Sequence, residues 1–254
     1  MLDQITPLIL TRDEEANLPR TLARLGWAKD VVIVDSFSTD ATLDIAARFP
    51  NVRLFTRELD DLAGQSNYGL AQVRTPWVLL LDADYFVTDE LIAELAALQP
   101  SAQAYVASFR YAIGGRPLRA SLYPPRVVLL HRDHCRVWQD GHAHRVKVDG
   151  ATGVLQGQIV HDDRKSLRRF VQRQRKYMRE EAAKLRRAEP GTLNLAARLR
   201  KLVVVAPFAV VVHALFVKGL VFDGVAGLHY AFERFVAECI LSWELVKGGL
   251  RIED

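Results

Sequence analysis

WVLLLDAD, residues Trp77–Asp84, is the stretch that decides the fold of the chain. Its first five residues are apolar, and a run of this length and branching is typical of a buried strand rather than a helix. The strand ends in Asp82 and Asp84, which can both turn toward one point. Because unpaired charge is costly to bury, the pair needs a compensating cation or donors. Such oxygen ligands suit Mg²⁺ or Mn²⁺ held also by substrate phosphates; alternatively, the acids only cap a helix that starts near Thr88.

Three similar apolar runs precede this stretch, and segments with helical spacing separate them. Strands are expected at residues 5–10, 31–35, 52–55 and 77–82, with helical patterns at 18–25, 43–49 and 62–73. This alternation predicts an α/β fold with a mostly parallel sheet covered by helices on both faces. Ligands bind at the carboxyl ends of the strands in such sheets, so polar residues just past those ends are the site candidates.

Asp35 is the strongest of these candidates in the upstream half. It follows four apolar residues directly, and a carboxylate at that point can accept a hydrogen bond from a nucleobase or a ribose hydroxyl. Asp13 and Ser38 could simply cap helices, and for Thr39 and Asp40 we favour capping. The sequence lacks G-x-G-x-x-G and G-x-x-x-x-G-K-[ST], so neither a Rossmann dinucleotide site nor a P-loop is supported.

Three ordered motifs in this half resemble one known family. LTRDEEANLPRTLARLGWAKDVVIVDSFSTDAT, AGQSNYGLAQV and WVLLLDAD are together similar to glycosyltransferase family 2, which has the GT-A fold, and most similar to its lipopolysaccharide core β-1,4-glucosyltransferase-like branch. The resemblance is strong over residues 5–98. It implies an inverting transfer of a sugar from a nucleotide-diphosphate donor, with uridine diphosphate as the default carrier, to a hydroxyl group.

The resemblance also implies roles for particular residues. A nucleotide-sugar pocket would be formed by Thr11, Arg12, Glu14, Asp35, Gln65, Asn67 and Asp82. A divalent metal, Mg²⁺ or Mn²⁺, would be held by Asp84 together with Asp82. The chain departs from the family pattern at Asp13, where the family usually has Asn, and at Tyr85, where this branch usually has a further acid.

Residues 99–163 show a different pattern, with short alternating strands expected at 103–113, 126–131, 134–138, 143–148 and 154–160. We interpret them as antiparallel structure beside the parallel sheet, which is where acceptors bind in GT-A enzymes. The motif WQDGHAHRV, residues 138–146, matches the related branch at Asp140 and His144, but Arg145 replaces its Glu. Asp140 is therefore our candidate general base, with a turn-forming role as the alternative.

Three histidines are secondary candidates for the acceptor site or the metal shell. His142 and His144 alternate along one expected strand, but no third His or Cys stands at zinc-ligand spacing. His161 follows an apolar run and precedes two acids, so it could complete the metal or pyrophosphate shell. It could equally be an ordinary histidine at a strand end.

The C-terminal part combines a basic segment with apolar helical patterns. Residues 164–187 contain 11 Lys or Arg and 2 Asp or Glu, and they are followed by a nearly continuous apolar run at 202–217. The run is short for a spanning helix, so we expect shallow attachment to an anionic membrane surface, with a buried core helix as the alternative. An amphipathic helix follows to residue 248. No nucleic-acid-binding motif is present, and the two distant cysteines fit a reducing compartment.

We therefore expect a GT-A catalytic domain at residues 1–163, with a nucleotide-sugar-binding half at 1–98 and an acceptor half at 99–163. Residues 164–254 would be a membrane-associating helical region. The expected function is metal-dependent hexosyl transfer from UDP-hexose to a lipid-linked glycan in cell-envelope polysaccharide or lipopolysaccharide synthesis. The expected location is the cytoplasmic face of the inner membrane, peripheral or monotopic. The alternatives are a catalytically weakened nucleotide-sugar-binding protein and a nucleotidyltransferase.

Overall fold

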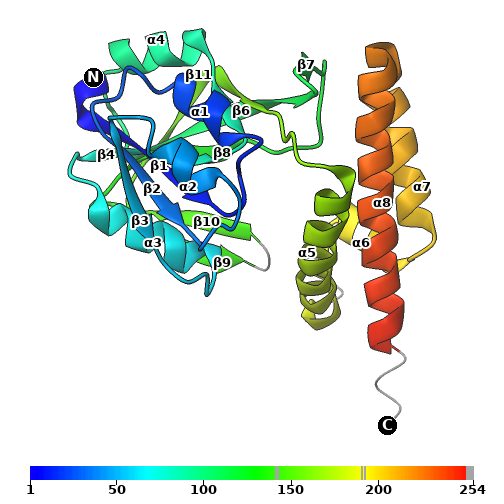
Figure 1. Cartoon of the computed structure of the whole chain (residues 1–254). Coiled ribbons are helices and arrows are strands. Elements are labelled where there is room, and N and C mark those ends of the chain that lie inside the picture. The colour runs from blue at the N-terminus through cyan, green and yellow to red at the C-terminus, as the bar shows by residue number, and fades with distance from the viewer. Residues whose placement is uncertain (141–142, 190, 192, 250–254) are drawn as a thin grey trace. The chain divides into compact units, whose positions relative to one another are not determined.

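The computed structural model of the chain describes residues 1–140, 143–189, 191 and 193–249, with only the backbone at residues 140, 143, 144 and 249 (Figure 1). The chain divides into two compact units. The first comprises Met1–Pro117 and Tyr123–Arg164, and the second comprises Leu118–Leu122 and the chain from Lys165 onward. The chain therefore passes between the units three times.

The first unit is built on one sheet whose strand order is β3-β2-β1-β4-β8-β6-β11-β5, with β7 paired to β6. β1, β2, β3 and β4 are mutually parallel, while β8 runs antiparallel between β4 and β6. The strands are β1 Ile5–Thr11, β2 Val31–Asp35, β3 Val52–Thr56, β4 Trp77–Asp82, β5 Tyr85–Val87, β6 Ala104–Ile113, β7 Arg116–Pro117, β8 Arg126–His131 and β11 Thr152–His161. Both faces of the central strands are buried, which explains their continuous apolar runs.

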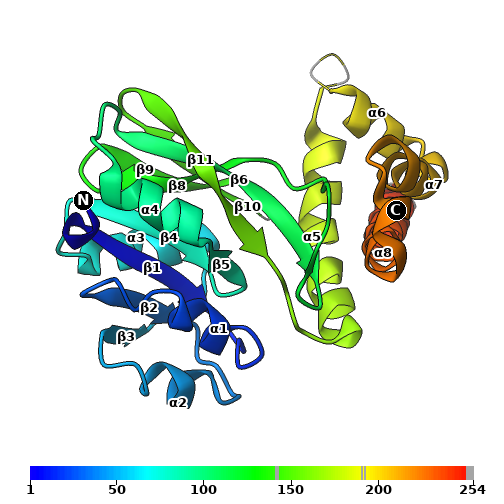
Figure 2. The same ribbon diagram turned by 90° about the horizontal axis from the view of Figure 1, so that it is seen from above.

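Helices cover both faces of this sheet (Figure 2). The helices are α1 Leu18–Ala23, α2 Thr42–Ala46, α3 Leu62–Gln72 and α4 Asp89–Ala97. α1 and α4 contribute Leu22 and Leu91 to the core on one face, and α3 contributes Leu70 to the core on the other. α4 crosses β11 so closely that a Cβ on Gly157 would lie 2.5 Å from the Cα of Leu91. Glycine is therefore required at this crossing.

The acceptor half departs from the expected antiparallel arrangement. Its strands lie close to the predicted positions, but β6 and β11 pair in parallel and extend the main sheet. The prediction was wrong for this pair because alternating burial does not report strand direction. Residues 114–151 return the chain to the end of the sheet at which β6 began. Within that segment, β9 Cys135–Asp140 and β10 Ala143–Val148 form a separate antiparallel hairpin.

The second unit is helical. It contains α5 Leu167–Arg187, α6 Leu195–Lys201, α7 Val205–Val212, the π-helical turn η3 His213–Val217, the 3₁₀ turn η4 Leu220–Asp223 and α8 Gly224–Gly249. Gly219 and Gly224, on either side of η4, both have positive φ. The segment Leu118–Leu122 belongs to this unit because Arg119 forms an ion pair with Asp223 and the Leu122 amide donates to Tyr230 Oη.

The length and hydropathy of the described helices in this unit determine whether any of them could cross a bilayer. None of them is by itself both long and apolar enough to cross a bilayer. Val205–Val217 and Leu220–Gly248 meet that criterion only as a pair, and the pair is bent by 75°.

Candidate nucleotide-sugar site

The predicted site residues of the upstream half gather at one edge of the sheet. β1 lies between β2 and β4, with Thr11 in register with Asp35 and Leu10 in register with Asp82. Because all three strands are parallel, their carboxyl ends meet there, as expected for a ligand-binding edge. The parallel pairing thus brings Thr11, Asp35 and Asp82 together.

Asp35 is fully buried and organises the loop that follows β2. Its Oδ2 accepts hydrogen bonds from Thr11 Oγ1 at 2.7 Å and from Ser38 Oγ at 2.6 Å, and its Oδ1 accepts one from the Ser38 amide at 2.7 Å. Donors to an ionised carboxylate form strong bonds, which compensate for its removal from water. In the structure, Asp35 therefore fixes the loop after β2 to the end of β1.

The same loop holds an aromatic residue in an uncommon backbone conformation. Phe37 has a φ of 56° and is 60% exposed. A bulky residue rarely adopts this left-handed region, and such outliers concentrate at functional sites. Asp13, in the neighbouring loop, has a φ of 53° and accepts from the Thr39 amide through its side chain. Asn and Asp tolerate this conformation best, so Asp13 keeps the backbone geometry that Asn would supply.

The other predicted donor-site residues have defined contacts. Gln65 is buried, and its Nε2 donates to Ser36 Oγ and to the Arg57 carbonyl, both at 2.9 Å. The amide of Asn67 instead pairs with both backbone groups of Val137 in β9, so it fastens the β9–β10 hairpin to α3. Arg12 is exposed, and the Glu14 carboxylate accepts from Asn17 Nδ2 at 2.9 Å.

Asp84 and His161 form the second half of the site. Asp84 lies in the turn between β4 and β5, and β5 pairs antiparallel with β11, placing Tyr85 in register with His161. As a result, His161 Nε2 lies 3.1 Å from Asp84 Oδ2, and the two side chains are only 13% and 11% exposed. The Nδ1 atom of His161 is buried without a hydrogen-bond partner. Sequence spacing indicated His161 as a candidate, and the sheet places it beside Asp84.

The backbone of the Asp-Ala-Asp turn is held from two sides. Thr21 on α1 donates from Oγ1 to the carbonyls of Ala83 at 2.7 Å and Tyr85 at 3.0 Å. The amide of Asp162, just after β11, donates to the Asp84 carbonyl at 3.1 Å. The direction in which Asp84 points is therefore fixed by groups that the motif itself does not contain.

Aromatic rings surround His161. Tyr85, Tyr111 and Tyr123 have their ring centroids 5.3, 4.6 and 4.8 Å from the imidazole, and the hydroxyls of Tyr85 and Tyr123 share a hydrogen bond. Burial lowers the pKa of His161, but the charge and hydrogen bond of Asp84, with the charges of Asp82 and Asp163, raise the pKa by more. Burial and the nearby Asp82 raise the pKa of both Tyr85 and Tyr123. Both phenols therefore stay protonated at neutral pH.

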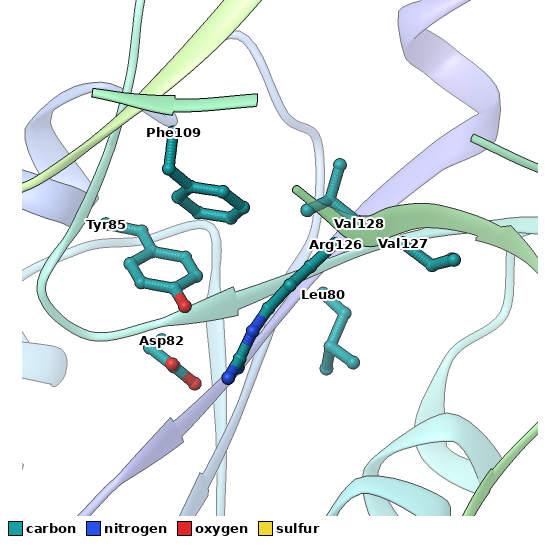
Figure 3. A pocket seen from close by; sticks show the side chains of 7 residues that line it. All are labelled: Leu80, Asp82, Tyr85, Phe109, Arg126, Val127 and Val128. Carbon is teal, nitrogen blue, oxygen red and sulfur yellow. The ribbon is translucent and has the colours of Figure 1, made fainter. Parts of the chain in front are cut away.

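A small pocket of about 20 Å³ lies beside Asp82 (Figure 3). Arg126, at the start of β8, extends toward Asp82 in this pocket, and its guanidinium lies 4.9 Å from the centroid of the Tyr123 ring. Burial lowers the pKa of Arg126, but Tyr123, Tyr85 and Asp82 raise it by more, so the guanidinium stays charged. No sequence motif indicated Arg126 as a site residue. Its position at the start of an apolar strand was the available signal.

A polar network that the sequence did not indicate connects the loop after β1 to the end of β11. Asn17 Nδ2 donates to Asp163 Oδ1 at 3.0 Å, and Asp162 Oδ2 accepts from Arg20 at 2.9 Å and from Arg164 at 2.7 Å. The side chain of Asp162 is only 4% exposed. This network holds the residues next to His161 against α1, and only the fold brings its members together.

The candidates in the WQDGHAHRV motif fall largely outside the described residues. His142 and the side chains of Asp140 and His144 are not described, while the backbones of Asp140 and His144 lie at facing ends of β9 and β10. The hairpin is anchored on α3 by Asn67 and by Gln139, whose Oε1 accepts from the Ala63 amide at 3.2 Å. The role of Asp140 therefore stays a prediction.

The donor groups near Asp84 fit a divalent metal that substrate also binds. The described residues contain no group of three or more His, Cys, Asp or Glu arranged to hold an ion. Mg²⁺ and its analogues commonly bind one or two protein ligands and complete their shell with phosphate oxygens and water. Asp84 Oδ2 and His161 Nε2 face each other closely enough to serve as those two ligands.

Comparison with known proteins identifies the family of the chain. The model of the family described as Glycosyl transferase family 2 matches residues 8–190, which is most of the chain. The chain belongs to glycosyltransferase family 2, and its first unit has the GT-A-like α/β fold of that family.

Curated relatives resemble only part of the chain. The lipopolysaccharide core biosynthesis glycosyltransferase LpsC of Rhizobium meliloti is 31% identical over 100 residues, covering 37% of this chain and 37% of the relative. A TPR repeat-containing protein of Synechococcus elongatus is 32% identical over 105 residues, covering 40% of this chain and 26% of that protein. The matches thus span about a quarter to two fifths of each relative.

Solved structures give more distant matches. The S. aureus TarS 1–349 structure in complex with UDP-GlcNAc aligns with 97% of this chain and 92% of its own, at 15% identity and a TM-score of 0.47. A Mycobacterium tuberculosis glucosyl-3-phosphoglycerate synthase, in complex with Mn²⁺ and UDP-glucose, covers 43% of this chain at 17% identity and a TM-score of 0.35.

Proposed function

We propose that this protein transfers a hexose from a UDP-linked donor to a hydroxyl of a lipid-linked glycan, with inversion at the anomeric carbon and with a divalent metal. One observation carries the proposal: Asp35, Asp82 and the Asp84–His161 pair lie at the carboxyl ends of strands in one sheet. Membership of glycosyltransferase family 2 supports sugar transfer from an activated donor. The donor and the acceptor are inferred from the family resemblance, and the metal from the facing side chains of Asp84 and His161.

The nucleoside is expected to bind along the loops after β1 and β2. Asp35 holds the loop of residues 36–39 in place, and Phe37 projects from it with most of its ring exposed. An exposed aromatic ring is a suitable surface for stacking a nucleobase, which contributes about 1–3 kcal/mol per base in nucleic-acid complexes. We therefore assign Phe37 to the uracil, with Thr11, Arg12 and Glu14 close to the nucleotide.

The diphosphate is expected beside Asp84 and His161. These two side chains would hold Mg²⁺ or Mn²⁺, and the ion, when bound, neutralises charge on the diphosphate oxygens. The pocket beside Asp82 has room for about one water molecule. Asp82 and Arg126, whose side-chain ends lie next to each other, would therefore contact the sugar from the same side, one accepting and the other donating hydrogen bonds to hydroxyl groups. Thr21 and Asp162 keep the turn that presents Asp84 in position.

Transfer then requires one bond to form and one to break. The acceptor hydroxyl oxygen bonds to the anomeric carbon while the bond from that carbon to the diphosphate oxygen breaks, and the electron pair leaves with UDP. A carboxylate on the opposite side of the sugar takes the hydroxyl proton, as in inverting glycosidases. Asp140 is our candidate for that carboxylate because the β9–β10 hairpin that carries it is fastened to α3, next to Gln65.

The replacement of the branch's Glu by Arg145 favours one other candidate function, a nucleotide-sugar-binding protein with weakened catalysis. A nucleotidyltransferase would also use a parallel sheet and metal-binding acids, but it would release pyrophosphate from a nucleoside triphosphate. The three functions differ in their products, so product analysis separates them.

The deciding experiment follows UDP release by the purified full chain. A panel of UDP-sugars is incubated with Mn²⁺ or Mg²⁺, with and without a polyprenyl-diphosphate-linked sugar as acceptor. We expect acceptor-stimulated UDP release with one donor, loss of release in Asp84→Asn and no loss in the control Asp89→Asn, since Asp89 is an exposed acid on α4. Stabilisation by a UDP-sugar without turnover would instead support the binding protein, and full activity of Asp84→Asn would reject the metal site.

A further inference from the structure

The second unit exposes large apolar side chains on several of its described helices. Its most exposed members include Phe208 at 63%, Phe216 at 68%, Phe222 at 74%, Val225 at 77% and Trp243 at 66%. They come from α7, η3, η4 and α8, elements that contact one another in the fold. We call them the apolar face. Soluble monomers rarely expose so many large apolar side chains on neighbouring elements unless another molecule covers them.

The exposed residues of α8 lie along one side of that helix. Val225, Leu228, Phe232, Trp243 and Val246 are separated by 3, 4, 11 and 3 residues, spacings that return to the same side of an α-helix. Tyr230, Ala237 and Leu241 are buried and lie on the opposite side, where α8 contacts α5, α6 and α7. The apolar stripe is therefore not the surface by which α8 packs within its own unit.

Most acidic side chains in the described part of this unit are sheltered from solvent. Five of them are 11–17% exposed, and each has a basic neighbour: Glu181 and Glu238 form ion pairs with Arg200, Asp223 with Arg119 and Glu244 with Arg179, while Glu233 Oε1 lies 3.5 Å from His229 Nε2. A helical unit stable in water normally shows acids outside and apolar residues inside. Here carboxylates are sheltered while phenylalanines and a tryptophan are exposed.

Basic side chains remain exposed around the apolar face. Lys201 precedes α7, Lys218 lies between η3 and η4, and Lys247 lies in the last turn of α8, and all three are exposed. Cations beside an apolar surface attract anionic lipid headgroups, at about 1 kcal/mol for each Lys or Arg near the surface.

We propose that the second unit is a monotopic lipid-binding module whose apolar face enters one leaflet of an anionic bilayer. The bend of 75° between Val217 and Leu220 makes a shallow wedge of α7, η3 and α8, and it suits entry into one leaflet better than a straight span does. A second copy of the chain is a poorer occupant because it would bring Lys201, Lys218 and Lys247 close to their equivalents. The inference is independent of the proposed sugar transfer.

Flotation of the full chain with vesicles tests the module. We expect binding to vesicles of equimolar phosphatidylcholine and phosphatidylglycerol, weaker binding to pure phosphatidylcholine and a decrease with salt. Phe216→Glu combined with Val217→Glu should lower partitioning on the order of 100-fold or more, because acids are costly to move into the acyl region. Val154→Glu is the matched control, since Val154 is 66% exposed but lies on β11 of the first unit.

A second measurement keeps the test decisive if the double variant misfolds. Lipids brominated on the acyl chain should quench the emission of Trp243 in the wild-type chain, and Trp243→Phe should remove that quenching. The proposal is overturned if the folded wild-type chain does not float, if the double variant floats as well as the wild type, or if quenching does not depend on Trp243. Self-association without vesicle binding would point to a second copy. Because flotation needs no turnover, failure here leaves the proposed sugar transfer untouched.

Discussion

Asp84 and His161 are separated by 77 residues in sequence, yet their side chains meet at 3.1 Å because β5 pairs with β11. The pairing is antiparallel and short, and it joins the turn after β4 to the last strand of the first unit. The contact between these two residues therefore depends on the pairing of β5 with β11.

His161→Ala should weaken Mn²⁺ binding by at least about 10–100-fold, a loss typical even of groups outside the first coordination shell. The physical reason is that only one of two facing ligands would be left. Mn²⁺ titration in the presence of UDP, followed by calorimetry, measures this change. His134→Ala is the control because His134 is exposed and follows the end of β8 that pairs with the start of β4, away from Asp82. Unchanged affinity in His161→Ala would remove His161 from the metal shell.

Removing divalent metal with EDTA should abolish UDP release, and added Mn²⁺ should restore it. Without UDP-sugar, the same treatment should leave the thermal midpoint nearly unchanged, because the Asp84–His161 hydrogen bond and the core do not require an ion. Turnover assays with the wild-type chain test the expected loss of UDP release, and thermal melts test the unchanged midpoint. Activity that persists in EDTA would show that the diphosphate leaves without an ion.

Thr21→Val should reduce kcat more than it changes KM for the donor. The substitution removes the hydroxyl that bridges the carbonyls on either side of Asp84, and each lost bond to a buried acceptor costs about 1–3 kcal/mol. Thr75→Val is the matched control, since its Oγ1 donates to the Trp77 carbonyl at the opposite end of β4. Equal kinetic effects of the two variants, after correction for stability, would contradict a positioning role for Thr21.

Phe37→Gly should change stability and UDP affinity in opposite directions. Glycine relieves the left-handed backbone at this position, so the free energy of unfolding should stay the same or rise by up to about 1 kcal/mol. Loss of the ring should weaken UDP binding by about 10-fold or more, in line with stacking energies of about 1–3 kcal/mol. Thermal melts and calorimetric UDP titrations supply the two values, with Phe37→Tyr as the conservative variant. Unaltered UDP affinity in Phe37→Gly would exclude stacking.

Gly157→Ala should lower the free energy of unfolding by about 1–3 kcal/mol, the usual cost of overpacking. The added Cβ would meet backbone atoms of Leu91, which cannot move aside as a side chain could. Gly26→Ala provides the comparison because a Cβ at Gly26 has no neighbour within 4 Å. Chemical denaturation of both variants measures the difference, and similar stabilities would show that α4 can shift on the sheet.

The sequence predicted the first half of the fold because β1, β2 and β4 are buried on both faces and each ends at a polar residue. The positions of Asp35 and of WVLLLDAD in the sequence predict which edge of the sheet carries the site. Strand direction in the second half was not predictable in this way, since the alternation in residues 104–113 and 152–161 is the same for parallel and antiparallel pairing.

The contacts around the site were less predictable than its acids. Arg126, Thr21 and Asp162 contact residues that lie 44–78 positions away along the chain, and nothing in their local sequence indicates which turn they contact. Asn67 was expected to face the nucleotide sugar, and the structure shows its amide paired with Val137. Local pattern reports burial and secondary structure, whereas these partners are set by tertiary pairing.

The helical unit includes the segment Leu118–Leu122, which is inserted in the sequence of the first unit, so it is not simply a C-terminal extension. Shortening the gene after Arg164 would remove the groups that Arg119 and Leu122 bind, and the largely buried Leu118 would lose its surroundings. Exchange of helical units between homologous enzymes should therefore succeed only when this five-residue insertion travels with them, so the two parts are expected to be inherited together.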